Sequence, residues 1–326
     1  MAANDCVYDY IFKSNLAKSM LDCGDIVQAG KTKRSYCFIC DRTMDKIGKR
    51  EDLVRWQYET LRKVFGFEDT ESTRTLFHKS ATSKEAWRIN IIWSSALLPF
   101  LIFHSVSKDN PIKILLSEYG EREFTCVDFE WQNKIVNGGG ASCVDVVLSN
   151  EDGEMLFLES KLTEYLRMTC RGGDVLPCVT YGDQYDRLFS RPWNGYSISK
   201  QYTKDKKGRP AFRIVTQTPH YLTGIKQMVS HFMGIRDNLG CRIKCKVAYL
   251  AEVLFDFRDE ISIKGIDPLA DYKQMHSELV RHLRREESRV AIVPEVLTYQ
   301  ACASGLNLPN RVLDFYRLNE NSAEEA

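Results

Sequence analysis

The chain has 326 residues, of which 44% are hydrophobic, 27% are charged and 9 are proline. This ordinary globular composition excludes wholesale disorder and fibrous repeats. Lysine and arginine total 45 against 44 acidic residues, which gives a formal net charge of +1. Any surface that binds a polyanion must therefore be a local basic patch and not a property of the whole chain.

The sequence favours a cytoplasmic protein without a membrane segment. Its longest apolar stretch, residues 91–105, is shorter than the roughly 18 apolar residues that span a bilayer. Residues 1–15 lack both the basic and the apolar region of an export signal. Because such a compartment keeps thiols reduced, we expect the 11 cysteines to form no disulfides.

The residues before position 81 are predicted to form a helical N-terminal extension over 1–80, with an amphipathic helix at 51–65. Within it, Cys37 and Cys40 have the C-x-x-C spacing of half a zinc site. A second pair at matching spacing is missing from the sequence. The alternatives are a Zn²⁺ site completed by cysteine or histidine residues distant in the sequence, and two buried free thiols.

Residues 81–257 are predicted to form the core of the protein, with a long insertion at about 163–219. The apolar patterns predict, in order, a helix, three strands, a second helix and a last strand. Residues 258–326 are predicted to add helices and a polar tail. The expected elements are helices at 82–104, 183–189 within the insertion, 221–235, 268–287 and 294–303, and strands at 123–131, 142–149, 154–162 and 244–257.

Two of these strands form a hairpin that carries the main candidate site. The turn Asn150-Glu151-Asp152-Gly153 is typical of a tight antiparallel connection. Pairing centred on this turn places Asp145 directly opposite Glu159, with Cβ atoms roughly 4.5–5.5 Å apart. Because strand side chains alternate, Lys161 lies on the same face as Glu159.

Two carboxylates and a lysine on one sheet face suggest a site for a hard divalent cation. Desolvated like charges repel each other, and Mg²⁺ or Mn²⁺ bound by carboxylate oxygens and water would remove that cost. A bound cation lowers the pKa of water, and the lysine can orient or deprotonate the attacking water. The alternative is a solvated sheet face with a cross-strand ion pair.

The set Asp145 and Glu159-Ser160-Lys161 resembles the D…(D/E)xK signature of the PD-(D/E)xK nuclease superfamily, and the order of elements is similar to its core. The resemblance implies an α/β fold with a restriction-endonuclease-like αβββαβ core, a mixed sheet and helical N- and C-terminal extensions. It also implies that Asp145, Glu159 and the Ser160 carbonyl bind the metal and that Lys161 is catalytic. Val144 stands where many members have proline.

Two further residues are candidates by the same resemblance. Many members supply another acid from the first core helix, where Glu85 is the candidate here, although a capping box formed with Thr82 explains Glu85 equally well. Gln227 lies on the helix that follows the insertion, where bacterial restriction-endonuclease-like proteins carry a supporting glutamine or lysine. Gln227 and His231, one turn later, either line the site or form a surface or partly buried polar pair.

A basic segment within the insertion is the candidate nucleic-acid-binding region. It contains one aromatic residue, Tyr202, and only Asp205 opposes its positive charge. A basic loop of this kind can follow a phosphate backbone, and the alternative is a solvated loop. The candidate contacts are Lys200, Lys204, Lys206, Lys207 and Arg209.

Together these features predict a Mg²⁺- or Mn²⁺-dependent nuclease that hydrolyses DNA phosphodiester bonds. Paired cuts in duplex DNA usually need two active sites, which favours a homodimer. The alternative function is a nuclease-fold protein with a weak or inactive centre that binds nucleic acid or a partner protein. An RNA-directed enzyme would use the same metal chemistry.

Overall fold

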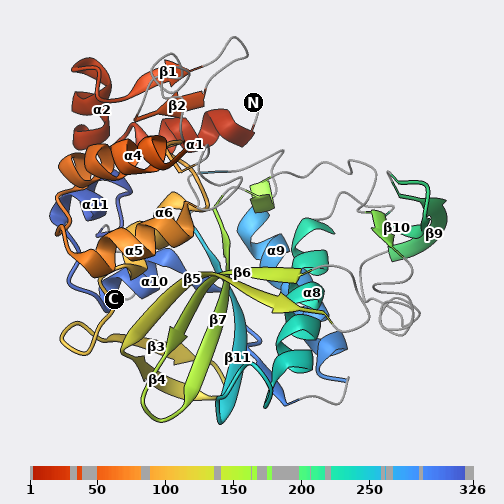
Figure 1. Ribbon diagram of the computed structural model, residues 1–326. Helices are drawn as coiled ribbons and strands as arrows, with labels where there is room; N and C mark the ends of the chain where they lie inside the picture. The colour runs from red at the N-terminus through yellow and green to blue at the C-terminus, as the bar shows by residue number, and fades with distance from the viewer. Residues whose placement is uncertain are drawn as a thin grey trace, which may run out of the picture.

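The protein has a mixed α/β fold built on a central six-stranded sheet with helices on both faces (Figure 1). The computed structural model describes most of the chain. The described residues are 3–29, 35–38, 50–81, 89–135, 141–162, 164–166, 175–177, 198–205, 207–216, 222–257, 261, 267–285 and 289–319.

The central sheet is mixed, as the sequence predicts. Its strand order is β12-β11-β7-β6-β5, and β13 also pairs with β11. Strand β6 is antiparallel to both β5 and β7, whereas β11 runs parallel to β7, β12 and β13. The strands are β5 (Cys126–Lys134), β6 (Ala141–Ser149), β7 (Glu154–Lys161), β11 (Val247–Leu254), β12 (Val290–Ile292) and β13 (Leu297–Thr298).

The β6–β7 hairpin has the predicted turn and register. Gly153 has a φ of +82°, a conformation that glycine adopts without steric cost. The Asn150 side chain closes the turn by accepting the Glu154 N–H at 2.9 Å. Pairing runs from Ser149–Met155 to Val146–Leu158. The next position in this register is Asp145 opposite Glu159, which confirms the predicted alignment of the two strands.

Helix α8 (Leu222–Asn238) and helix α9 (Pro268–Leu283) cover one face of the sheet, and α5 (Glu71–Ser80), α6 (Leu97–Phe103) and α10 (Tyr299–Ser304) lie on the other side (Figure 1). Gly234 lets α8 lie directly on the sheet. A Cβ atom there would lie 3.0 Å from the Asn133 Cβ and 3.1 Å from the Ser142 Cβ. The side chains that α8 directs at the sheet are therefore held close to β5 and β6.

The N-terminal and C-terminal segments pack together. Helix α11 contacts α2 and α4, and buried residues from Val7 to Leu318 belong to one hydrophobic core. None of the described helices is long and apolar enough to cross a membrane. The remaining elements here are α1 (Ala3–Ile11), α2 (Asn15–Asp22), α4 (Arg50–Phe65), α11 (Asn310–Phe315), and the two-stranded sheets β1 (Val27–Ala29) with β2 (Ser35–Cys37) and β3 (Ile112–Leu116) with β4 (Gly120–Phe124).

The helix predicted at 82–104 is wrong over residues 89–96, which form turns, and only α6 is helical in its described part. The Phe38 N–H donates to the Asn90 carbonyl at 3.0 Å, and the Ile92 N–H donates to the Tyr36 carbonyl at 3.2 Å. This pairing with the N-terminal segment replaces the hydrogen bonds of a helix. Residues 82–88, which include Glu85, lie outside the described residues.

Two other predicted elements change their boundaries. The strand predicted at 123–131 is divided at Thr125, because β4 pairs with β3 and β5 pairs with β6. The helix predicted at 294–303 begins only at Tyr299. The preceding residues of β13 extend the sheet edge beside β11, and the Thr298 hydroxyl caps the helix by accepting the Ala301 N–H at 3.2 Å.

The prediction that the basic segment of the insertion is a loop is wrong, since its described residues form an antiparallel β-hairpin. Within the insertion, η2 (Glu164–Leu166) is a short 3₁₀-helix, and β8 (Val175–Pro177), β9 (Ile198–Lys204) and β10 (Pro210–Thr216) form a sheet of order β8-β10-β9. Backbone pairing of β9 with β10 runs from Lys204–Pro210 to Ile198–Thr216, which a solvated loop would lack. This small sheet lies apart from the central sheet (Figure 1). The helix predicted at 183–189 lies outside the described residues.

Candidate active site

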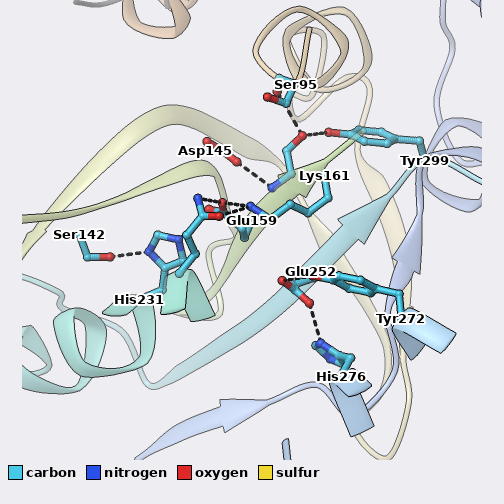
Figure 2. Close-up of polar contacts among 12 residues, drawn as sticks. Ser95, Ser142, Asp145, Glu159, Lys161, His231, Glu252, Tyr272, His276 and Tyr299 are labelled. Atoms are coloured by element: carbon cyan, nitrogen blue, oxygen red, sulfur yellow. Dashed lines mark hydrogen bonds and ion pairs between the residues drawn. The ribbon is translucent and has the colours of Figure 1, made fainter. Parts of the chain in front are cut away.

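Three elements bring four of the predicted site residues together, and Figure 2 labels three of them, Asp145, Glu159 and Lys161. Asp145 comes from β6, Glu159 and Lys161 come from β7, and Gln227 comes from α8. Glu159 and Lys161 are only 1% and 2% exposed. A carboxylate and an ammonium group buried so deeply must be neutralised by partners, because their desolvation is costly.

Lys161, Glu159 and Gln227 form a closed triangle of charge-assisted contacts. The Lys161 ammonium is ion-paired with Glu159 Oε1. Gln227 donates from Nε2 to the same carboxylate oxygen at 2.6 Å and accepts from Lys161 Nζ through its Oε1 at 2.7 Å. The two ends of one amide thus hold both members of the ion pair. This arrangement joins the partly buried Gln227 to Glu159 and Lys161.

His231 fixes the second oxygen of Glu159. Its Nε2 lies 2.6 Å from Glu159 Oε2, and its Nδ1 is hydrogen-bonded to the Ser142 hydroxyl. Because an ionised carboxylate can only accept, the imidazole proton in this contact belongs on Nε2. His231 is spaced one helical turn from Gln227, so both side chains reach Glu159 from the same face of α8.

The partners of Glu159 outweigh its burial. Burial alone would raise the pKa of this carboxyl, but the Lys161 charge and the hydrogen bonds from His231 and Lys161 lower it to about 2. Glu159 is therefore ionised at neutral pH. Since the lysine is the largest of these opposing influences, the negative charge depends on Lys161.

At Asp145, which lies next to Glu159, burial and repulsion outweigh the favourable contacts, so its pKa is raised. Burial of its carboxyl, followed by the negative charge of Glu159, holds the pKa of Asp145 well above its ordinary value. Lys161 and a 2.7 Å hydrogen bond from the Ser160 N–H to Asp145 Oδ2 oppose this effect only in part. The residue as a whole remains partly exposed. The favourable contacts of the Asp145 carboxylate at the edge of the site therefore do not offset its burial and the repulsion from Glu159.

Glu130, which no sequence pattern singles out, occupies the position of β5 opposite Asp145. The pairs Phe129–Val146 and Trp131–Val144 flank this position, and the ladder is interrupted between them. Glu130 has a φ of +53°, a left-handed conformation that is uncommon for a residue other than glycine. Its charge contributes to the raised pKa of Asp145. No sequence pattern signals such a backbone conformation.

The Cys143 thiol lies beside the same acidic residues. It donates to Glu130 Oε2 at 3.0 Å. Burial, followed by the hydrogen bond to Glu130, raises the pKa of this thiol well above its ordinary value. Cys143 is therefore a neutral thiol at physiological pH and not a nucleophilic thiolate.

Ser160 anchors the site strand from the opposite face of the sheet. Its hydroxyl donates to the Ser95 carbonyl at 3.1 Å and lies 2.5 Å from the Tyr299 hydroxyl. These contacts fix the strand segment that carries Glu159 and Lys161. The role of the Ser160 carbonyl as a metal ligand stays a prediction.

A second buried polar cluster, also missed from the sequence, lies on the neighbouring strand. Glu252 of β11 is in register with Glu159. It accepts a hydrogen bond from the Tyr272 hydroxyl at 3.0 Å and lies 2.7 Å from His276 Nδ1, both on α9 (Figure 2). Glu252 is fully buried. Its two oxygens are used to hold α9 on the sheet, which separates it from the Glu159 network.

The other predicted ligands are only partly described. Glu85, Cys40 and Lys206 lie outside the described residues, and Cys37 is buried in β2. Within the described ranges, no group of three or more histidine, cysteine or acidic residues has an arrangement that could hold a metal ion. Both the zinc site and the Mg²⁺ or Mn²⁺ site therefore stay predictions. Lys200 and Lys204 belong to β9, and Lys207 and Arg209 lie in or beside the turn that follows.

No protein-family model matches the chain, and neither the curated proteins nor the solved structures include a significant match to it.

Proposed function

We propose that the protein is a Mg²⁺- or Mn²⁺-dependent nuclease with a restriction-endonuclease-like core, which hydrolyses DNA phosphodiester bonds. The observation that carries the proposal is the grouping of Asp145, Glu159 and Lys161 on one sheet face, with Gln227 joined to the last two. The order α6, β5, β6, β7, α8, β11 supports it, because it follows the succession of elements that the resemblance implies.

The residues present fit a hard divalent cation. Asp145 faces two other carboxylates without full compensation, and a cation would offset that repulsion. Glu159 Oε2 has one protein donor and keeps acceptor capacity, while Oε1 is saturated by Lys161 and Gln227. Asp145, Glu159 and the Ser160 carbonyl are the groups that would hold the ion, together with water. When bound, it would stabilise the charge that develops on the phosphate and lower the pKa of water.

The remaining residues have separable roles. Lys161 donates to a carboxylate and to an amide oxygen, so it acts as a positively charged donor and not as a base in this state. In the reaction we assign it to orienting the attacking water and balancing phosphate charge. Gln227 fixes the Lys161 ammonium, and His231 fixes the Glu159 carboxylate. These contacts preorganise the site before substrate binds.

The test is cleavage of plasmid, linear duplex and single-stranded DNA, and of RNA, in Mg²⁺ or Mn²⁺. Lys161→Ala and Asp145→Ala should each abolish cleavage. Glu252→Gln is a matched control because it alters a buried strand glutamate next to the site without touching Lys161. It should retain activity per folded molecule. Cleavage by Lys161→Ala at the wild-type rate would refute the assignment.

A nuclease-fold protein that only binds nucleic acid or a partner protein is the second candidate. The observation in its favour is that Glu159 is neutralised by protein donors alone. Titration calorimetry separates the two functions. The nuclease should bind Mg²⁺ or Mn²⁺ in a manner lost in Asp145→Ala, whereas DNA binding without metal binding would favour the second candidate.

A further inference from the structure

The β9–β10 hairpin presents an exposed aromatic ring. Tyr202 is 76% exposed, and in the described part of the chain only Leu115, at 72%, is a comparably exposed large hydrophobic residue. Leu115 lies on β3, in a different sheet. Tyr202 and Lys204 are two residues apart on β9, so strand alternation places their side chains on the same face of the hairpin.

The hairpin has a net positive charge, and its one acidic residue is already ion-paired within the hairpin. Between residues 198 and 216 the sequence has a single carboxylate, Asp205. It is ion-paired with Arg209 at 2.7 Å and accepts the N–H groups of Lys207 at 2.8 Å and Arg209 at 2.9 Å. Lys204 and Lys207 are exposed, and no carboxylate of the described residues lies within ion-pair distance of either.

From this arrangement we infer that the hairpin binds a single-stranded segment of nucleic acid, with a base stacked on Tyr202 and phosphates contacted by Lys204 and Lys207. Unpaired bases can stack on an exposed aromatic face, whereas the bases of an intact duplex are stacked on one another and the duplex presents its phosphates to the hairpin. The inference rests on the proposed nuclease function and names the form of substrate that the protein holds.

Binding is measured with the full-length protein in EDTA, so that cleavage does not interfere. The probes are fluorescein-labelled oligothymidine, oligouridine and a DNA duplex, followed by fluorescence anisotropy. Tyr202→Ala should weaken oligothymidine binding by about 5-fold to 150-fold, the range that loss of one stacked base implies. Tyr202→Phe should retain binding because it keeps the ring. Leu115→Ala is the control for loss of an exposed hydrophobic residue and should have no effect.

The lysines are tested by salt dependence. Each phosphate contact on a single strand contributes about 0.7 to the slope of log K against log salt concentration. The double substitution Lys204→Ala and Lys207→Ala should therefore reduce that slope by about 1.4. All four side chains altered in these variants are exposed, so thermal unfolding should match that of the wild type.

Failure of this inference and failure of the nuclease assignment give different results. Lys161→Ala should lose cleavage and keep binding. Tyr202-dependent binding by a protein that never cleaves DNA would support the hairpin surface and refute the nuclease. Tyr202-dependent binding of oligouridine in place of oligothymidine would support the surface and overturn the assignment to DNA. Wild-type affinity in Tyr202→Ala, or no single-strand binding by the wild type, would overturn the inference.

Discussion

Replacing Asp145 by asparagine and Glu159 by glutamine removes one negative charge from each of two neighbouring strands, and we expect opposite effects on the free energy of unfolding. The pKa of Glu159 is lowered by Lys161 and His231, so its charge stabilises the folded protein. The pKa of Asp145 is raised by burial and by Glu159, so its charge destabilises the folded protein above the ordinary carboxyl pKa.

The magnitude for Glu159 follows from its pKa. The lowering from 4.5 to about 2, at about 1.4 kcal/mol for each pH unit, corresponds to about 3 kcal/mol at neutral pH. Glu159→Gln should therefore lower the free energy of unfolding by about this amount at neutral pH. Asp145→Asn should increase the free energy of unfolding by about 0.5–2 kcal/mol, the range typical of single stabilising substitutions.

The assay is urea denaturation in EDTA at a series of pH values. The contribution of Glu159 should be constant above the unfolded-state pKa of about 4.5 and should decline as the pH falls towards 2. The difference between wild type and Glu159→Gln should therefore shrink with acidification. Equal destabilisation by both variants at pH 7 would refute the electrostatic reasoning, since it would show that Asp145 is stabilised by its surroundings.

Three further predictions concern the surroundings of these two carboxyls. Gly234→Ala should destabilise the protein by about 1–3 kcal/mol, because the new Cβ would press α8 away from β5 and β6. Urea denaturation measures the loss of stability. A variant as stable as the wild type would contradict the close approach of α8 to the sheet. His231→Ala should cost about 1–3 kcal/mol by leaving a buried Glu159 oxygen without its donor, and a neutral result by differential scanning calorimetry would show that this contact is dispensable. Mg²⁺ affinity should fall as the pH is lowered, because protons compete with the ion for the Asp145 carboxylate. Calorimetry in buffers of different ionisation enthalpy should detect the release of protons when Mg²⁺ binds. If no proton is released, Asp145 is already ionised before the ion binds.

Local sequence patterns predicted the elements that carry the site. The turn at Asn150–Gly153 and the alternation of the two strands determine the β6–β7 register, so the relation of Asp145 to Glu159 could be worked out without a structure. Helix α8 was predictable because its apolar face repeats with helical spacing. The segment 89–96 was not predictable from local pattern, since its backbone pairs with β2, a strand more than fifty residues earlier.

The buried polar contacts that the sequence did not reveal depend on long-range placement. Glu252 is a single acid in an otherwise apolar strand, and only the packing of α9 reveals its partners, Tyr272 and His276. Glu130 becomes relevant because of a left-handed backbone conformation in mid-strand. The role of His231 had a weak signal, its spacing of one turn from Gln227, but its bond to Glu159 required the α8-to-sheet contact.

The measurement that tests the central claim most directly is the rate of DNA cleavage in Mg²⁺ by the wild type, Lys161→Ala and Glu252→Gln at equal concentrations of folded protein. We predict metal-dependent cleavage by the wild type and Glu252→Gln and none by Lys161→Ala. Cleavage that survives loss of the Lys161 ammonium, or a wild type that binds Mg²⁺ and DNA and leaves every substrate intact, would contradict the proposed function.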